Sequence, residues 1–237
     1  MPAPVRYSNG VTNVGPNNPF AELGMLDPTK HIVFHNDFFS YAAADWVITT
    51  VEAGAGSATE ALASGNGGLL LVTNDSADDD SDFFQWAGNA GAAIETFKFI
   101  SGKKTWFKAR FKVSDATQSD FVMGLQITDT TPLAVTDGVY FRKDDGDADL
   151  DFVVIKDSTA TTASAFATAA DDTFMTLAFY YNGVDAIKFY KDDVQLGTSV
   201  TTNLCDDEEL AVSFGIQNGA AAAKSMTVDY ITCITER

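Results

Sequence analysis

The chain has 237 residues, of which 46% are hydrophobic and 20% charged, which suits one large globular domain or two small ones. Its 33 acidic and 15 basic residues give a formal net charge of -18, which argues against nucleic acid and anionic membranes as partners, because both attract basic patches. No apolar run reaches the roughly 18 residues of a membrane span, and the first residues lack the apolar core of a signal peptide, so synthesis in a cytoplasm is expected.

Residues 1–30 differ from the rest of the chain, because they hold five of its six prolines. Proline cannot donate to a sheet ladder, so this segment is not expected to join one. The segment also carries apolar residues that a purely disordered tail would lack, namely Tyr7, Val11, Val14, Phe20, Leu23 and Leu26. We interpret it as an extended arm that packs along its own domain or on a neighbouring subunit, with a disordered tail as the remaining alternative.

The body of the chain, residues 31–237, begins with aromatic and β-branched residues. Residues 32–38 and Trp46–Ile48 predict a first strand and its return, and the apolar run Gly67–Asn74 predicts a buried strand. An acidic loop follows, with Asp78, Asp79, Asp80 and Asp82. Phe83–Trp86 predicts the next strand.

The stretch Thr105–Ile127 shows the strongest period-two alternation in the chain. Apolar residues on one face of its first half alternate with Lys108, Arg110 and Lys112 on the other. After a polar turn, a second apolar series follows at Phe121, Met123, Leu125 and Ile127. Such alternation is typical of strands with one buried and one wetted face. The basic stripe is unusual on an acidic protein, and we expect it to be an assembly face covered by a neighbour's acidic loops, or otherwise a solvated sheet face.

Further strands are predicted at regular spacing towards the C-terminus. Two hairpins are expected, one around an acidic turn and one around Asn182-Gly183, a strong hairpin signal. The predicted strands are Val139–Lys143, Leu150–Lys156, Phe174–Tyr181, Ala186–Tyr190, Val194–Thr198, Leu210–Ile216 and Met226–Ile234. No segment shows sustained helical spacing with caps. We therefore predict an all-β fold, an antiparallel two-sheet sandwich of the jelly-roll type over residues 31–237, preceded by the arm.

Two cysteines are too few for a secreted disulfide framework. Cys233 lies in an apolar strand pattern, where a thiol behaves as a small hydrophobe. The sequence favours free thiols at Cys205 and Cys233, with a single bridge between them as the alternative.

Acidic residues supply the candidate metal ligands. Asp145, Asp147 and Asp149 have the alternate spacing of a calcium loop, but the glycine comes too early and the closing glutamate is missing. The loop from Asp78 to Asp82 is a second candidate. Solvated turns are the simpler interpretation of both, and no cofactor is expected.

Candidates for catalysis and sugar binding are equally open to a structural interpretation. Asp147, Asp149 and Asp151 could supply the carboxylate pair of a glycoside hydrolase, although the row starts inside a turn. The only histidines, His31 and His35, come without a nucleophile motif. Trp46, Trp86 and Trp106 could stack on sugars or belong to the core. We therefore expect that the chain is not an enzyme.

Three blocks of the sequence resemble a family of virion proteins from tailed bacteriophages. They are VRYSNGVTNVGPN in the arm, SGKKTWFKARFKVSDATQSDFVMGLQITDTTPLAVTDGVYFRKDDGDADLDF in the body, and MTVDYI near the C-terminus. The body is also similar to concanavalin-like and laminin-G-like jelly rolls.

This resemblance implies a capsid decoration (cement) protein at the surface of the virion, assembled in the host cytoplasm. Its partners would be the major capsid protein and further copies of itself in a dimer or trimer, with the apolar arm residues as contacts. The alternatives are a carbohydrate-binding virion module for host adhesion and a component of a tail or head fibre.

Overall fold

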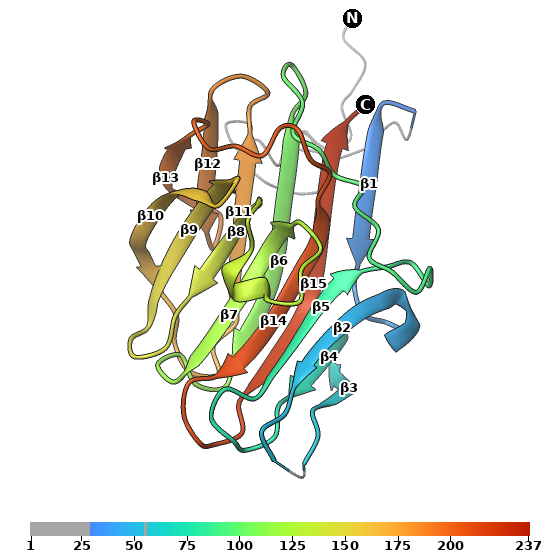
Figure 1. The fold of residues 1–237 in the computed structure, drawn as a ribbon, viewed down its shortest axis with the longest axis vertical. Helices are drawn as coiled ribbons and strands as arrows, with labels where there is room; N and C mark the ends of the chain where they lie inside the picture. Colours follow the sequence, from blue (N-terminus) through green and yellow to red (C-terminus); the bar gives the residue numbers. More distant parts are fainter. Residues whose placement is uncertain (1–28, 55) are drawn as a thin grey trace, which may run out of the picture.

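The computed structural model describes residues 29–237 except residue 55, and these residues form two antiparallel sheets packed face to face (Figure 1). The prediction of an all-β sandwich is confirmed. Among the described residues the only helical segments are two 3-10 turns, η2 (Ala43–Asp45) and η3 (Pro132–Ala134). No helix in this part of the chain has the length and apolarity needed to cross a membrane.

Sheet A has eight strands. They are β1 (His31–Asn36), β3 (Thr59–Gly65), β4 (Gly67–Thr73), β6 (Thr105–Val113), β11 (Met175–Tyr181), β12 (Ala186–Lys191), β13 (Val194–Val200) and β15 (Ser225–Glu236). Their order is β13-β12-β11-β6-β15-β4-β3, and β1 pairs with β15 beside this path. β6 therefore lies in the middle of the sheet, and β13 lies at one edge.

Sheet B has seven strands. They are β2 (Trp46–Val51), β5 (Ser81–Trp86), β7 (Ser119–Gln126), β8 (Gly138–Lys143), β9 (Asp149–Lys156), β10 (Thr159–Thr168) and β14 (Ala211–Asn218). Their order is β10-β9-β8-β7-β14-β5-β2. The two predicted hairpins are confirmed, because β8 pairs with β9 and β11 pairs with β12.

Two features of the connectivity differ from the sequence-based expectation. β2 is not the return of β1, since β1 pairs with β15 in sheet A whereas β2 pairs with β5 in sheet B. The strands β3 and β10 were not predicted at all. Both lie at sheet edges and are rich in alanine, threonine and serine, so they lack the apolar alternation that marks a half-buried strand.

The inner faces of the sheets form an aromatic core. In β6 the predicted alternation is confirmed, with Phe107, Ala109, Phe111 and Val113 fully buried. Phe111 meets Phe121 of β7 edge to face at 5.2 Å between ring centroids, across the sandwich. The prediction of free thiols is also confirmed, since both cysteines are buried and unbridged.

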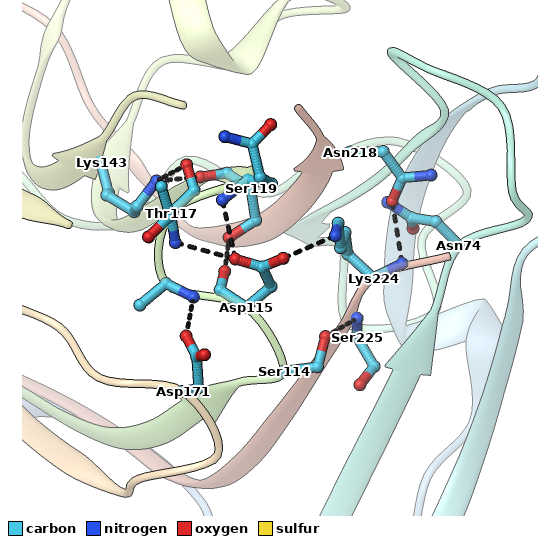
Figure 2. A network of polar contacts seen from close by, with 12 residues as sticks. Asn74, Ser114, Asp115, Thr117, Ser119, Lys143, Asp171, Asn218, Lys224 and Ser225 are labelled. Atoms are coloured by element: carbon cyan, nitrogen blue, oxygen red, sulfur yellow. Dashed lines mark hydrogen bonds and ion pairs between the residues drawn. The ribbon is translucent and has the colours of Figure 1, made fainter. Parts of the chain in front are cut away.

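A network of polar contacts fixes the turn between β6 and β7 to the segment that leads into β15 (Figure 2). One oxygen of Asp115 accepts the backbone N–H groups of Thr117 and Gln118 at 2.9 and 2.8 Å. The other lies 2.7 Å from the Lys224 ammonium, whose side chain is only 8% exposed. Nearby, the fully buried Lys143 donates to the carbonyls of Thr117, Ser119 and Asp144. Asp115, Lys224 and Lys143 are therefore all partnered.

The substitution Asp115→Asn removes the charge that pairs with Lys224 and keeps the shape of the side chain. We expect the free energy of unfolding at pH 7 to fall, because the Lys224 ammonium stays buried while its anion is lost. The loss should be only about 1–2 kcal/mol, because solvent partly screens the Asp115 carboxylate. Urea denaturation of both proteins measures the difference.

The stability difference between this variant and the wild type should depend on pH. The hydrogen bond from Lys224 lowers the pKa of Asp115 to about 2, so its stabilisation is complete above the unfolded pKa of about 4 and is lost as the pH falls through 2. The two proteins should therefore converge in stability between pH 4 and pH 2. Asp172→Asn is the control, since its partner is Lys112 and its side chain is 69% exposed. An equal loss in both variants would contradict the prediction.

Candidate functional site

The acidic turn of the β8–β9 hairpin encloses a small pocket of about 220 Å³. The structure brings Asp147 and Asp149 together in its lining, with Asp144, Asp151, Ser164 and Ala165. Asp145 is not part of this lining, because its side chain lies against Gly219. Gly146, with a φ of 95°, turns the chain between Asp145 and Asp147. Two of the three residues of the predicted calcium site at Asp145, Asp147 and Asp149 thus line the same pocket. The site itself stays a prediction.

Several of the carboxylates in this pocket already have partners. Arg142 lies 3.1 Å from Asp144 and 3.6 Å from Asp151, and the Ala165 N–H donates to the other oxygen of Asp151 at 2.8 Å. Asp147 accepts the N–H of Asp149 at 2.8 Å. Both oxygens of Asp151 are thus engaged, which leaves it poorly placed as the nucleophile of a glycoside hydrolase.

A larger hollow of about 350 Å³ lies on the outer face of sheet B, where the η3 loop meets β2 and β5. We call it the η3 groove. Its lining combines apolar groups with hydroxyl, amide and carboxylate groups, and it consists of Thr49, Val51, Asp79, Ser81, Phe83, Thr130, Thr131, Pro132, Leu133, Ala134 and Gln217. Sequence reasoning missed this groove, because strand pairing and one loop bring its residues together and no motif links them.

Trp46 and Trp86 pack in the core between the sheets, whereas Trp106 belongs to a separate buried cluster with Ala178, Tyr190 and Ile234 on the other face of sheet A. Trp46 and Trp106 are 5% and 2% exposed. Trp86 packs against the core and meets Trp46 edge to face at 5.1 Å. These three side chains therefore offer no exposed platform for a sugar ring.

The basic stripe lies on the outer face of sheet A, and acids of the same chain pair with it. Lys108 lies 2.6 Å from Asp193, and Lys112 lies 2.9 Å from Asp172. Arg110 pairs with Asp229 and also stacks on Phe174, with 4.1 Å between the guanidinium carbon and the ring centroid. The role of this stripe as an assembly face stays a prediction, but its charges are largely compensated within the chain.

The arm contacts predicted at Tyr7, Val11, Val14, Phe20, Leu23 and Leu26 lie outside the described residues. The two residues that follow, Thr29 and Lys30, lead into β1, and the Lys30 carbonyl accepts the N–H of Arg237 at 2.7 Å. The first described residues therefore lie beside the C-terminus.

Comparisons with protein families and with curated proteins find no match, whereas solved structures share the fold. A protein of unknown function, SO2946 from Shewanella oneidensis, is 15% identical with a TM-score of 0.59, covering 94% of this chain and 96% of its own. A GH16 protein from Bacteroides ovatus, solved with a G4G4G3G product, is 11% identical with a TM-score of 0.59, covering 84% and 98%. The metal-free carbohydrate recognition domain of Emp46p is 10% identical with a TM-score of 0.53, covering 84% and 93%.

These likenesses show a jelly-roll fold and correct one expectation. The prediction that the chain is not an enzyme is contradicted, because proteins with this fold include glycoside hydrolases. The prediction took a missing motif as evidence against catalysis. In a β-sandwich, however, functional side chains come from separate strands, so a motif in the sequence is not required. At these identities the likeness assigns no activity to this chain.

Arg110→Ala tests what the basic stripe does within the fold. We expect a loss of about 2–3 kcal/mol in the free energy of unfolding, because Asp229 is only 7% exposed and would lose its cation and Phe174 its stacking partner. Lys108→Ala should cost less than about 1 kcal/mol, since Asp193 is exposed and well screened.

Thermal and urea denaturation of both variants measure these losses, and gel filtration reports their oligomeric state. An unchanged elution volume for both is expected if the stripe serves the fold of its own chain. Dissociation of an oligomer by Lys108→Ala would instead show that the stripe is an assembly face.

Proposed function

We propose that this chain is a structural protein of a tailed-bacteriophage virion and decorates the head shell. The sequence resemblance in the arm, the body and the C-terminal segment supports the proposal. The structural observation that carries it is an edge strand suited to contact with another protein chain.

That edge strand is β13, whose sequence VQLGTSV holds no charged residue. Val194, Leu196 and Val200 are 60%, 43% and 57% exposed, although the chain as a whole carries a net charge of -18. Exposed edge strands are commonly protected by charged side chains, because their free N–H and C=O groups can pair with another chain. An exposed apolar edge on a strongly acidic protein therefore supports the proposal of a protein partner there.

In this proposal the β13 edge and the N-terminal arm contact different partners. The apolar edge at β13 contacts a neighbouring copy, and the arm binds the major capsid protein. The acidic remainder faces solvent, where its charge favours solubility. A position in a tail or head fibre would use the same surfaces, and the copy number per particle distinguishes the two locations.

Deletion of residues 1–30 should abolish binding to purified shells and leave a folded sandwich, because every strand of the two sheets begins at or after His31. Co-sedimentation with shells measures binding, and circular dichroism checks the fold. Undiminished binding of the truncated protein would contradict the role of the arm.

Leu196→Lys should weaken self-association by placing a charge on the β13 edge, as measured by analytical ultracentrifugation. Leu62→Lys is the matched control, since Leu62 is 51% exposed on β3 at the other edge of sheet A. Equal behaviour of the two variants would show that β13 is no special contact.

A second candidate function, supported by the η3 groove, is binding of a short neutral saccharide for adhesion to the host. The groove is lined by the apolar side chains of Phe83 and Val51 and by the polar ones of Thr49, Thr130 and Gln217, which is the mixed chemistry that sugar rings and hydroxyls require. The sugar-related names of the GH16 and Emp46p structures, which share only the fold, agree with this candidate.

Glycan-array screening of the full chain tests the second candidate. Gln217→Ala and Thr49→Ala should each raise the Kd of a bound glycan by about tenfold, the cost of one lost hydrogen bond of about 1.4 kcal/mol. Gln195→Ala on β13 is the control and should leave the Kd unchanged. The absence of any glycan signal for the full chain would contradict this candidate.

A further inference from the structure

Three carboxylates meet at one end of the sandwich, between the loop that joins β2 to β3 and the loop that joins β4 to β5. Glu52, Asp75 and Asp80 each offer an oxygen atom, and these atoms lie within 4.8 Å of one another. β2 pairs with β5 so that Thr50 stands opposite Asp82. Two residues further along, the same antiparallel register brings Glu52 to Asp80. Asp75 joins them from the end of β4.

Backbone groups hold these carboxylates in place. The Ala58 N–H donates to Glu52, and Asp80 accepts the N–H groups of Ala53 and Ala77 at 2.7 and 2.9 Å. Asp75 lies so close to the loop backbone that a Cβ at Gly56 would come within 1.8 Å of its carboxylate. The three acids are thus drawn together although like charges repel.

A second observation is the presence of buried oxygens without a hydrogen-bond partner. Asp82 is fully buried, and while the Thr50 hydroxyl donates to its Oδ1 at 2.5 Å, its Oδ2 has no partner. The Oε2 atom of Glu52 is likewise buried without a partner, and so is the Oδ1 atom of Asn74, which precedes Asp75. The carboxyl group of Glu60 lies against that of Asp82, and Glu52 is a further charged neighbour, so Asp82 borders the group of three carboxylates.

No basic side chain compensates this charge in the part of the chain that the structure describes. The ion pairs found there involve other acids, and none includes Glu52, Glu60, Asp75, Asp80 or Asp82. Leaving a buried carboxylate oxygen, such as Asp82 Oδ2 or Glu52 Oε2, without a cation or a donor costs roughly several kcal/mol. The arrangement is therefore missing a positive charge.

We propose that this cluster binds a calcium ion, with Glu52, Asp75 and Asp80 as direct ligands. All the candidate ligands are oxygens, as a hard cation requires. Calcium accepts irregular geometry at bond lengths of about 2.3–2.6 Å, so two of its ligands can lie up to about 5 Å apart, whereas magnesium demands a tighter octahedron. An ion here would tie the β2–β3 loop to the β4–β5 loop and so link sheet B to sheet A at this end. The inference does not depend on the proposed virion role.

The test uses the full chain after treatment with EDTA and dialysis. Isothermal titration with CaCl₂ should show one site with a Kd at or below about 1 mM, the weak end of known calcium modules. Differential scanning calorimetry should show a higher Tm with calcium than without, and a smaller effect of magnesium. No binding heat and no change in Tm would overturn the proposal, and an equal effect of magnesium would overturn the assignment to calcium.

Variants locate the site. Glu52→Gln and Asp75→Asn should each abolish the calcium-dependent rise in Tm, yet fold without calcium at least as well as the chelated wild type, because each removes charge repulsion. Asp147→Asn, in the acidic turn of the β8–β9 hairpin, is the matched control and should keep the full rise. Loss of the rise in Asp147→Asn, with both other variants unaffected, would place the ion at that turn and overturn this site.

Discussion

The packing of β6 against β7 across the sandwich is the contact on which the rest of the structure depends. The two strands are consecutive in the sequence but lie in the middle of opposite sheets, β6 between β11 and β15 and β7 between β8 and β14. Their inner faces meet through contacts such as that of Phe111 with Phe121. Each fully buried phenylalanine contributes roughly 2–3 kcal/mol from the area removed from water. Every other strand extends a sheet that this pair begins.

The acidic composition is accommodated by the ends and outer faces of the sandwich. Basic residues form ion pairs with acids of the same chain, as in the pairs Asp115–Lys224 and Arg110–Asp229. With 33 acids and 15 bases, many carboxylates must find other partners. At exposed turns water serves this purpose. At Asp80 and Asp82, which are fully buried, water is excluded, and the shortage of cations becomes a structural constraint.

Prediction from sequence succeeded where local pattern decides the structure. The alternation in β6 and the Asn182-Gly183 turn are local signals, and each produced the expected element. β7 is a strand as predicted, but its expected wetted face is buried, because Val122 packs in an apolar cluster with Leu133 of η3. The strands β3 and β10 were not predicted, because edge strands need no buried face and so lack apolar alternation. The partners of β1 and β2 could not be predicted either, since pairing depends on contacts far apart in the sequence. For the same reason Asp80 was noticed only as part of an acidic loop, and its approach to Glu52 was not foreseen.

The two outer faces of the sandwich differ in a way that separates possible roles. The outer face of sheet A carries long charged side chains that pair within the chain, beside an apolar cluster of Trp106, Ala178, Tyr190 and Ile234, and its edge strand β13 holds no charged residue. The outer face of sheet B carries a second apolar cluster around Phe83, Val122 and Tyr140, which the η3 loop covers in part, leaving a groove. The proposed contact with other protein chains and the proposed binding of a small ligand therefore involve different surfaces. A change at the edge of sheet A can alter assembly without touching the groove, so the two activities can be examined independently in one protein.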